Sequence, residues 1–303
     1  MSRPTDNVAT MLTVIIGLGS ALVYGAADFL GGLAAKRMSA IAVTAIVALS
    51  GLVAVTIVGV PLIGGVWSRE AILLGALSGV AGAVAIGLLY ACLAIGPMSI
   101  LSPLTAVVSA VVPLTIGLIG GERLGTLGYI ALGLALVAIV LVGFTPPGKG
   151  ELVRNAVRPS LKGVLMAVGS GTAIGIFLVI IDATPDDSGI VPLVANRATN
   201  SAIMFALVGI LALIAWRRGR PRGAFVPAAV WLAVAGGVLD AAANTGLLFG
   251  VRLGELSVIA VLTALYPAGT IILAAIVLKE RIAVLQYVGL VLAIVAGAML
   301  ALA

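Results

Sequence analysis

The chain has 303 residues, and 62% of them are apolar before its 39 glycines are counted, whereas soluble domains contain about 45–50% apolar residues with glycine included. Charged side chains make up only 9%, too few to cover the water-facing surface of a soluble protein of this size. The composition therefore excludes an ordinary soluble domain and predicts a multi-pass membrane protein. Histidine is absent and Cys92 is the only cysteine, which excludes an intrachain disulfide, a His/Cys metal or haem site, and acyl transfer by a Ser/His/Asp or Cys/His arrangement.

Ten runs are long and apolar enough to be predicted as membrane helices, since about 20 residues at 1.5 Å per residue cross roughly 30 Å of hydrocarbon. They are bounded mostly by charges, proline or glycine, and they cover residues 12–35, 41–63, 71–94, 98–119, 124–144, 163–181, 190–215, 225–250, 255–278 and 283–302. The first run is too long for the apolar region of a signal peptide and is kept as a membrane helix. Residues 1–11 are predicted to be an N-terminal tail, and residues 145–162 a polar linker that divides the chain nearly in half.

The two halves of the chain align with each other. Residues 96–143 fall on 254–301 at a shift of 158, and the first run falls on the sixth at a shift of 150; the matched pairs include Gly79 with Gly237, Gly96 with Gly254, Ser99 with Ser257, Glu122-Arg123 with Glu280-Arg281, and Gly25 with Gly175. The economical interpretation is two five-helix repeats, 12–144 and 163–302. Because five is odd, the repeats are predicted to be inverted, as in many secondary transporters. The predicted fold is thus an all-α integral membrane protein with ten transmembrane helices in two inverted repeats.

Several motifs carry a family resemblance. They are Tyr90 followed by Gly96-Pro97-x-Ser99, a proline-containing span, Gly121-Glu122-Arg123-Leu124 with a glycine-rich span after it, and a second copy from Gly254 through Lys279-Glu280-Arg281. With these motifs the chain resembles the EamA-type transporters of the drug/metabolite transporter superfamily over nearly its whole length. Tyr24 stands where that family has a tryptophan in its first helix. The resemblance implies a fold of five plus five helices and says little about the substrate.

Charge sorts the predicted loops into two sides. The loops after odd-numbered spans carry twelve Lys and Arg against two Glu, whereas the side with both termini carries four Arg against seven acids. The positive-inside rule therefore predicts that loops 36–40 and 216–224 are cytoplasmic and that both termini lie outside the cytoplasmic membrane. The family resemblance implies cytoplasmic termini instead, and we adopt the charge count. The pI of about 9.9 is explained by this topology, and we predict no nucleic-acid partner.

Asp28, Arg197 and Asp240 are the charged residues that fall inside predicted spans. Each costs about 2.5–3.5 kcal/mol at a helix centre on an insertion scale, so partners or water must offset the cost. The polar set continues along the same spans, and its members are the candidates for binding substrate or a coupling ion: Tyr24, Asp28, Asn196, Arg197, Asn200, Asp240 and Asn244. In the repeat alignment Asp240 falls on Gly82 and Asp28 on Leu178. Polar residues that do not repeat indicate a single asymmetric site on a symmetric scaffold.

Depth along the helices indicates which charges can meet. At 1.5 Å per residue, Arg197 lies roughly 10 Å from the side with the termini, Asp240 about 15 Å and Asp28 about 24 Å. Arg197 can therefore pair with Asp240, while Asp28 needs water, a substrate amine or a proton. The alternative is a buried structural ion pair without a transport role.

Glycine and proline mark helix contacts and bends. The faces Gly75-x-x-x-Gly79, Gly171-x-x-x-Gly175 and Gly246-x-x-x-Gly250-x-x-x-Gly254 are predicted to let helices approach closely rather than to touch substrate. Pro103, Pro113 and Pro267 lie within spans and are candidate hinges, or fixed kinks.

These observations favour a secondary active transporter that moves a small metabolite, of amino-acid, amine or drug-like kind, by alternating access. The chain contains no Gly-x-x-x-x-Gly-Lys-Ser/Thr phosphate loop, so a gradient must drive transport, with Asp28 or Asp240 as proton carrier. We predict no enzymatic activity, catalytic residue, metal or cofactor; the expected partners are the small-molecule substrate, protons and the bilayer, and the oligomeric state is left open. A membrane scaffold or sensor, or an intramembrane enzyme, are the alternative classes.

Overall fold

The computed structural model describes residues 4–95, 98–143, 160–218, 226–279 and 282–302, with only the backbone at 4–9, 90–95, 98–100 and 102–103. These residues form helices joined by short turns, without a strand: α1 (Pro4–Ala35), α2 (Ala40–Ala54), the π-helix η1 (Val55–Gly59), α3 (Val60–Ile63), α4 (Arg69–Ile95), α5 (Met98–Ile119), α6 (Thr126–Gly143), α7 (Leu161–Asp182), the 3₁₀ turn η2 (Asp186–Ser188), α8 (Val191–Arg217), α9 (Pro227–Leu253), α10 (Leu256–Thr263), α11 (Tyr266–Val277) and α12 (Val284–Ala301). Parts of three predictions fall outside the described residues: the first three residues of the tail, most of the 145–162 linker, and positions 219–224 of the loop predicted to be cytoplasmic.

Helix ends follow local sequence signals. The Oγ atoms of Ser39 and Ser160 accept hydrogen bonds from the third backbone N–H that follows, which caps α2 and α7. Pro192, Pro227 and Pro267 occupy the first turns of α8, α9 and α11, where the missing N–H costs no helical hydrogen bond.

Nine spans in the described residues are long and apolar enough to cross a membrane, which confirms a multi-pass membrane protein. Two of them combine segments: α2, η1 and α3 form one, and α10 with α11 forms another. The tenth predicted span is the helix α5, whose described apolar part, Leu104–Ile119, is shorter. The count of ten spans and their inverted relation therefore stay predictions.

The first helix differs from its prediction at its N-terminal end. We expected a tail over residues 1–11, but α1 begins at Pro4. Residues 4–9 include Asp6 and Asn7 and lie before the apolar span Thr10–Ala35, yet they continue the turns of the same helix.

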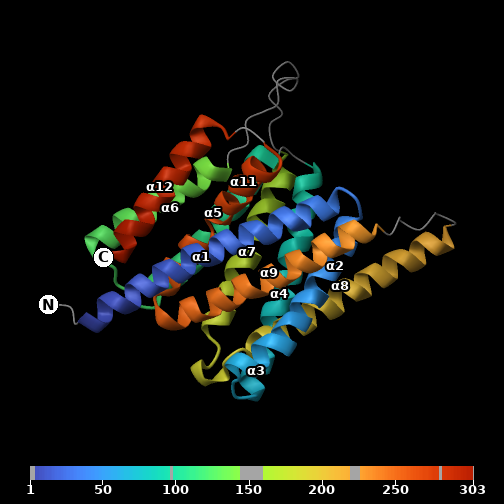
Figure 1. The fold of residues 1–303 in the computed structure, drawn as a ribbon, viewed down its shortest axis with the longest axis horizontal. Coiled ribbons are helices and arrows are strands. Elements are labelled where there is room, and N and C mark those ends of the chain that lie inside the picture. The colour runs from blue at the N-terminus through green and yellow to red at the C-terminus, as the bar shows by residue number, and fades with distance from the viewer. Residues whose placement is uncertain (1–3, 96–97, 144–159, 219–225, 280–281, 303) are drawn as a thin grey trace.

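The helices pack in a layered bundle with α6 and α12 side by side at one end (Figure 1). Helix α1 runs along α9 and α11, α7 along α4 and α5, and α8 along α4 and α2. The predicted small-residue faces lie in these contacts. A Cβ atom on Gly79 would come within 2.5 Å of the Asn196 carbonyl oxygen, and one on Gly175 within 2.6 Å of Val112 Cβ, which confirms their packing role.

The two faces of the bundle are named here by their loops. The terminal face carries residues 64–68, 120–125, 183–190 and 254–255, and the opposite face carries the loop at 36–39 and the outer ends of α4, α8 and α11. Large apolar side chains cover the sides between the two faces, including Leu62 at 79% exposure and Trp231 at 73%, as expected where lipid is the solvent.

Candidate functional site

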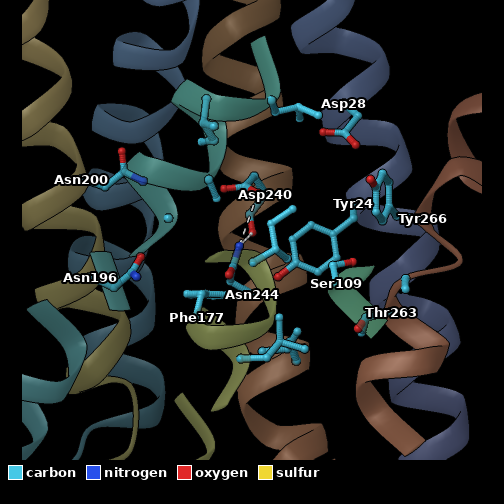
Figure 2. Close-up of a pocket in the computed structure, with 18 of the residues that line it drawn as sticks. Tyr24, Asp28, Ser109, Phe177, Asn196, Asn200, Asp240, Asn244, Thr263 and Tyr266 are labelled. Atoms are coloured by element: carbon cyan, nitrogen blue, oxygen red, sulfur yellow. Dashed lines mark hydrogen bonds between the residues drawn. The ribbon is translucent and has the colours of Figure 1, made fainter. Parts of the chain in front are cut away.

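A cavity of about 240 Å³ lies inside the bundle and collects the polar residues of the membrane spans (Figure 2). Its walls come from both halves of the chain, with α1, α4 and α5 from the first and α7 to α11 from the second. All seven candidates singled out from the sequence line it: Tyr24, Asp28, Asn196, Arg197, Asn200, Asp240 and Asn244. The structure thus brings together residues that are more than 200 positions apart in the chain.

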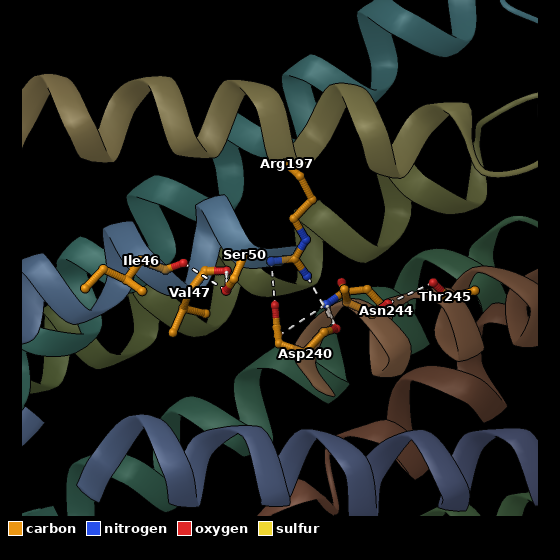
Figure 3. A network of polar contacts seen from close by, with 8 residues as sticks. Ile46, Val47, Ser50, Arg197, Asp240, Asn244 and Thr245 are labelled. Carbon is orange, nitrogen blue, oxygen red and sulfur yellow. Dashed lines mark hydrogen bonds and ion pairs between the residues drawn. The ribbon is translucent and has the colours of Figure 1, made fainter. Parts of the chain in front are cut away.

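Arg197 of α8 and Asp240 of α9 form an ion pair (Figure 3). Arg197 Nη1 lies 2.5 Å from Asp240 Oδ2, and the two side chains are 7% and 22% exposed. Nη2 of the same guanidinium donates to the Asp240 carbonyl at 3.4 Å. The pairing predicted from depth is therefore confirmed, and the two charges offset each other inside the membrane.

Asn244 and Asn196 fix the surroundings of this pair. Asn244 Nδ2 donates to the Asp240 carbonyl at 2.8 Å and to Asp240 Oδ1 at 3.3 Å, which holds the carboxylate one turn away on α9. Asn196 Nδ2 donates to Ser78 Oγ at 2.8 Å, and Ser78 donates to the Gly75 carbonyl. Asn196 therefore ties α8 to α4 through an amide that faces the cavity wall.

Asn200 differs from the other two amides because its side chain makes no hydrogen bond among the described residues. The residue is 6% exposed, and its Oδ1 has almost no accessible surface. Arg197 Nε is likewise without an acceptor in this part of the chain. A buried polar atom without a partner is costly, so the cavity wall contains unsatisfied polar atoms on α8.

Asp28 lies on α1, one turn after Tyr24, and faces the cavity (Figure 2). The residue is exposed although it lies within a membrane span, and it lines the cavity. Within the described part of the chain, no hydrogen bond or ion pair joins this carboxylate to another group. Asp28 is thus an accessible, unpaired acid in the interior of the bundle.

Several lining residues were missed from the sequence. Ser109, Phe177, Thr263 and Tyr266 also line the cavity, and they look like ordinary residues of apolar helices. The Tyr266-Pro267 dipeptide within a span is the one signal that pointed here, because α10 ends at Thr263 and α11 restarts at Tyr266. The break between these helices places a tyrosine at the cavity wall.

The three candidate hinge prolines differ. Pro267 lies at the break between α10 and α11, as a hinge or fixed kink requires. Pro113 lies within α5, which runs from Met98 to Ile119, and its role as a hinge or a fixed kink stays a prediction. Its ring packs where α7 has Gly175, with Pro113 Cδ 3.0 Å from a Cβ built on that glycine. The side chain of Pro103 lies outside the described residues.

Loops of the terminal face are joined by hydrogen bonds between the two halves. Ile190 N–H donates to the Gly64 carbonyl at 3.0 Å, and Val66 N–H to that of Asp187 at 2.9 Å. Gly189 has a φ of 51°, and a Cβ atom on it would collide with Gly64, so this turn requires glycine. Arg252 at the end of α9 donates to the Gly189 carbonyl at 2.8 Å.

Glu122 supplies a second connection on the same face. Its carboxylate accepts hydrogen bonds from the backbone N–H groups of Leu256 at 2.8 Å and Ser257 at 3.2 Å. These are the first two residues of α10, so a loop of the first half caps a helix of the second. Glu122 therefore has a structural role at the start of α10.

Comparison with known proteins gives a family match for the second half of the chain. Residues 161–302 match the model of the EamA-like transporter family, which confirms for these residues the resemblance drawn from the sequence motifs. One crystal structure of a protein is similar over 95% of this chain and 97% of its own, with a TM-score of 0.67 at 18% identity. At that identity the likeness supports the fold alone. No curated protein matches the chain.

Proposed function

We propose that the chain, whose residues 161–302 match the EamA-like transporter family, is a secondary active transporter of a small metabolite that works by alternating access. The observation that carries the proposal is the cavity of about 240 Å³, which gathers all seven polar candidates within an apolar bundle. Binding sites of secondary transporters lie near the midplane between two repeats, and this cavity draws its walls from both halves of the chain.

Helix pairing supports the proposed inverted repeats. Helix α1 packs on α9 as α7 packs on α4, and α2 packs on α9 as α8 packs on α4. The counterparts in the repeat alignment are α1 with α7, α2 with α8, and α4 with α9. When each helix is replaced by its counterpart, the α1–α9 contact becomes the α7–α4 contact, and the α2–α9 contact becomes the α8–α4 contact. The aligned glycines agree with this: Gly25 lies against Thr270 of α11, and Gly175 lies against Val112, the residue of α5 that aligns with Thr270.

Packing between the cavity and the terminal face supports the proposal that substrate enters the cavity from the opposite face. On the terminal side the bundle is filled by an apolar cluster that includes Ile181, Ile190 and Leu248, each 0% exposed. The loop hydrogen bonds of Arg252 and Glu122 lie beyond this cluster. A transport cycle requires a second state in which the terminal face opens, so the cluster and these hydrogen bonds must come apart in that state.

A proton gradient is the proposed source of energy, with Asp28 as the carrier. Its carboxylate is accessible and unpaired among the described residues, whereas Asp240, the second candidate, is bound to Arg197. A carboxylate that carries a proton through the transport cycle must be accessible from one face of the membrane and then from the other. In this state Asp28 is accessible from the cavity, which meets the first of these two conditions.

Flux in proteoliposomes tests the proposal. We would reconstitute the purified protein and measure accumulation of radiolabelled amino acids and their decarboxylated amines with and without a proton gradient. We expect gradient-driven accumulation of at least one compound, lost when an ionophore collapses the gradient. Folded protein that accumulates no compound in either direction would contradict transport and favour a membrane scaffold or sensor.

A further inference from the structure

We propose that the substrate of this cavity is a small organic monocation, with its ammonium nitrogen at Asp28 beside the rings of Tyr24 and Tyr266. The proposal rests on the proposed function, because it names the substrate class of the same cavity. Two independent features of the lining carry it: its charge and its aromatic side chains.

The charge of the described lining is unbalanced by one negative unit. Two carboxylates, Asp28 and Asp240, and one guanidinium, Arg197, line the cavity. Arg197 is already bound to Asp240 at 2.5 Å and is 6% exposed, so its charge is compensated within the protein and little of its surface reaches a ligand. A ligand with a single positive charge would neutralise Asp28, whereas an anion would meet only a second negative charge.

Aromatic side chains surround the position of that charge. Tyr24 precedes Asp28 by one turn of α1, and Tyr266 begins α11 at the helix break. Figure 2 shows both rings next to each other on the side of the cavity where Asp28 lies. The faces of tyrosine rings attract cations, so the two rings and the carboxylate form one cation-binding corner.

The apolar part of the lining indicates what accompanies the charge in the ligand. Ile174, Phe177, Leu247 and Ala260 supply an apolar wall away from the charge. A cation with one ring or a short aliphatic chain fits this space.

A series of matched ligands tests the charge without any mutation. Cyclohexylmethylamine, cyclohexylmethanol, cyclohexylacetate and cyclohexylalanine share one ring and differ in head group: cation, neutral, anion and zwitterion. We would measure their binding to the purified protein in lipid nanodiscs by isothermal titration calorimetry at pH 7. We expect the amine to bind at least about tenfold more tightly than the other three. Equal binding of the alcohol, or tighter binding of the acid or the zwitterion, would overturn the proposal.

Variants locate the binding site. Asp28→Asn should weaken binding of cyclohexylmethylamine by about tenfold or more, whereas Glu70→Gln, which removes an exposed carboxylate at the start of α4, should leave it unchanged. Tyr266→Leu removes a ring but no charge and should weaken binding of the amine more than that of the alcohol. Unchanged amine binding in both cavity variants would overturn the assignment.

These experiments distinguish a failure of the cation site from a failure of the proposed transport function. Binding of the amine without gradient-driven flux would support the cation site and contradict a transporter. Flux of a neutral or anionic compound, without preferential binding of the amine, would support a transporter and contradict the cation site.

Discussion

Arg197 and Asp240 illustrate how a costly pair of residues can be retained in a membrane span. Each charge alone would be expensive there, and the pair is accompanied by hydrogen bonds from Asn244 and to the Asp240 carbonyl. Removal of one partner leaves the other charge uncompensated, which costs more than removal of both.

A double-mutant cycle measures this coupling. Arg197→Ala alone should lower the free energy of unfolding by about 3–5 kcal/mol, and Arg197→Ala with Asp240→Ala should cost less than the sum of the single variants. As a control, Arg197→Ala combined with the distant Glu70→Gln should be additive. Additive costs for the 197–240 pair as well would contradict a stabilising contact between them.

Asp28 is tested by its amide. Asp28→Asn keeps the shape of the side chain and should fold with near-native stability, because the carboxylate has no partner to lose among the described residues. Gradient-driven flux should be abolished, since the amide cannot carry a proton. Flux of the parent and the variant would be compared in proteoliposomes with and without the gradient.

Counterflow at equal pH separates two roles of Asp28. If the carboxylate also binds the substrate cation, counterflow is lost together with gradient-driven flux. Survival of counterflow would assign only the proton to Asp28 and contradict the cation site. Transport against a gradient at the parent rate would make Asp28 structural and pass the coupling role to Asp240.

The polar members of the site could be predicted because ionisable and amide side chains are rare in membrane spans and therefore carry information singly. The hydroxyl and aromatic members could not. Thr263 Oγ1, for example, donates to the Ile259 carbonyl of its own helix at 2.7 Å, as many threonines do in apolar helices that have no site. Only the fold distinguishes it, by turning it toward the cavity.

At the scale of elements, hydropathy predicted where helices lie but not where they break. Pro113 and Pro267 are equivalent as residues, yet α5 continues through the first and α10 ends before the second. The neighbours of the two prolines differ: Pro113 packs against α7 at Gly175, where an added Cβ would lie 3.0 Å from Pro113 Cδ. The π-helix η1 in the second span also has no signal in the sequence. Such features depend on packing between helices, which a single run of residues does not specify.

Helix α10 has eight residues, so its first turn depends strongly on its cap. Glu122→Ala removes the acceptor for the N–H groups of Leu256 and Ser257. The loss should lower the free energy of unfolding by about 1–2 kcal/mol, measured by thermal or denaturant unfolding in detergent. Glu70→Ala, an acid in the exposed first turn of α4, serves as the control and should cost less than 1 kcal/mol, in the range of a dipole interaction alone. Equal effects of the two variants would show that Glu122 is not a cap.

At the scale of the whole molecule, scaffold and site follow different patterns. Glycines repeat between the halves because each half uses the same close helix contacts, as Gly79 against α8 and Gly237 against α2 show. Asp28, Arg197 and Asp240 have no counterparts at the aligned positions. The repeated residues therefore account for the packing of two similar units, and the unrepeated ones gather at a single cavity between them.

Orientation is the last property that belongs to this scale, and it follows from charge. The opposite face carries the loop with Lys36 and the end of α8 with Arg217, and the excess of cations there should hold this face in the cytoplasm. In a Cys92→Ala background, Lys36→Cys and Arg69→Cys introduce single thiols at exposed positions on the two faces. An impermeant thiol reagent added to intact cells should label Arg69→Cys and spare Lys36→Cys until the cells are permeabilised.

The reverse labelling would put the termini in the cytoplasm without changing the fold. It would also change which compartment the cavity faces. With Lys36 inside, a state closed on the terminal face binds its substrate from the cytoplasm, and release outside requires the hydrogen bonds of Glu122 and Arg252 to break. With Lys36 outside, those same hydrogen bonds close the cytoplasmic side, and substrate enters the cavity first from outside the cell. The labelling result therefore determines whether breaking these hydrogen bonds releases substrate outside the cell or into the cytoplasm.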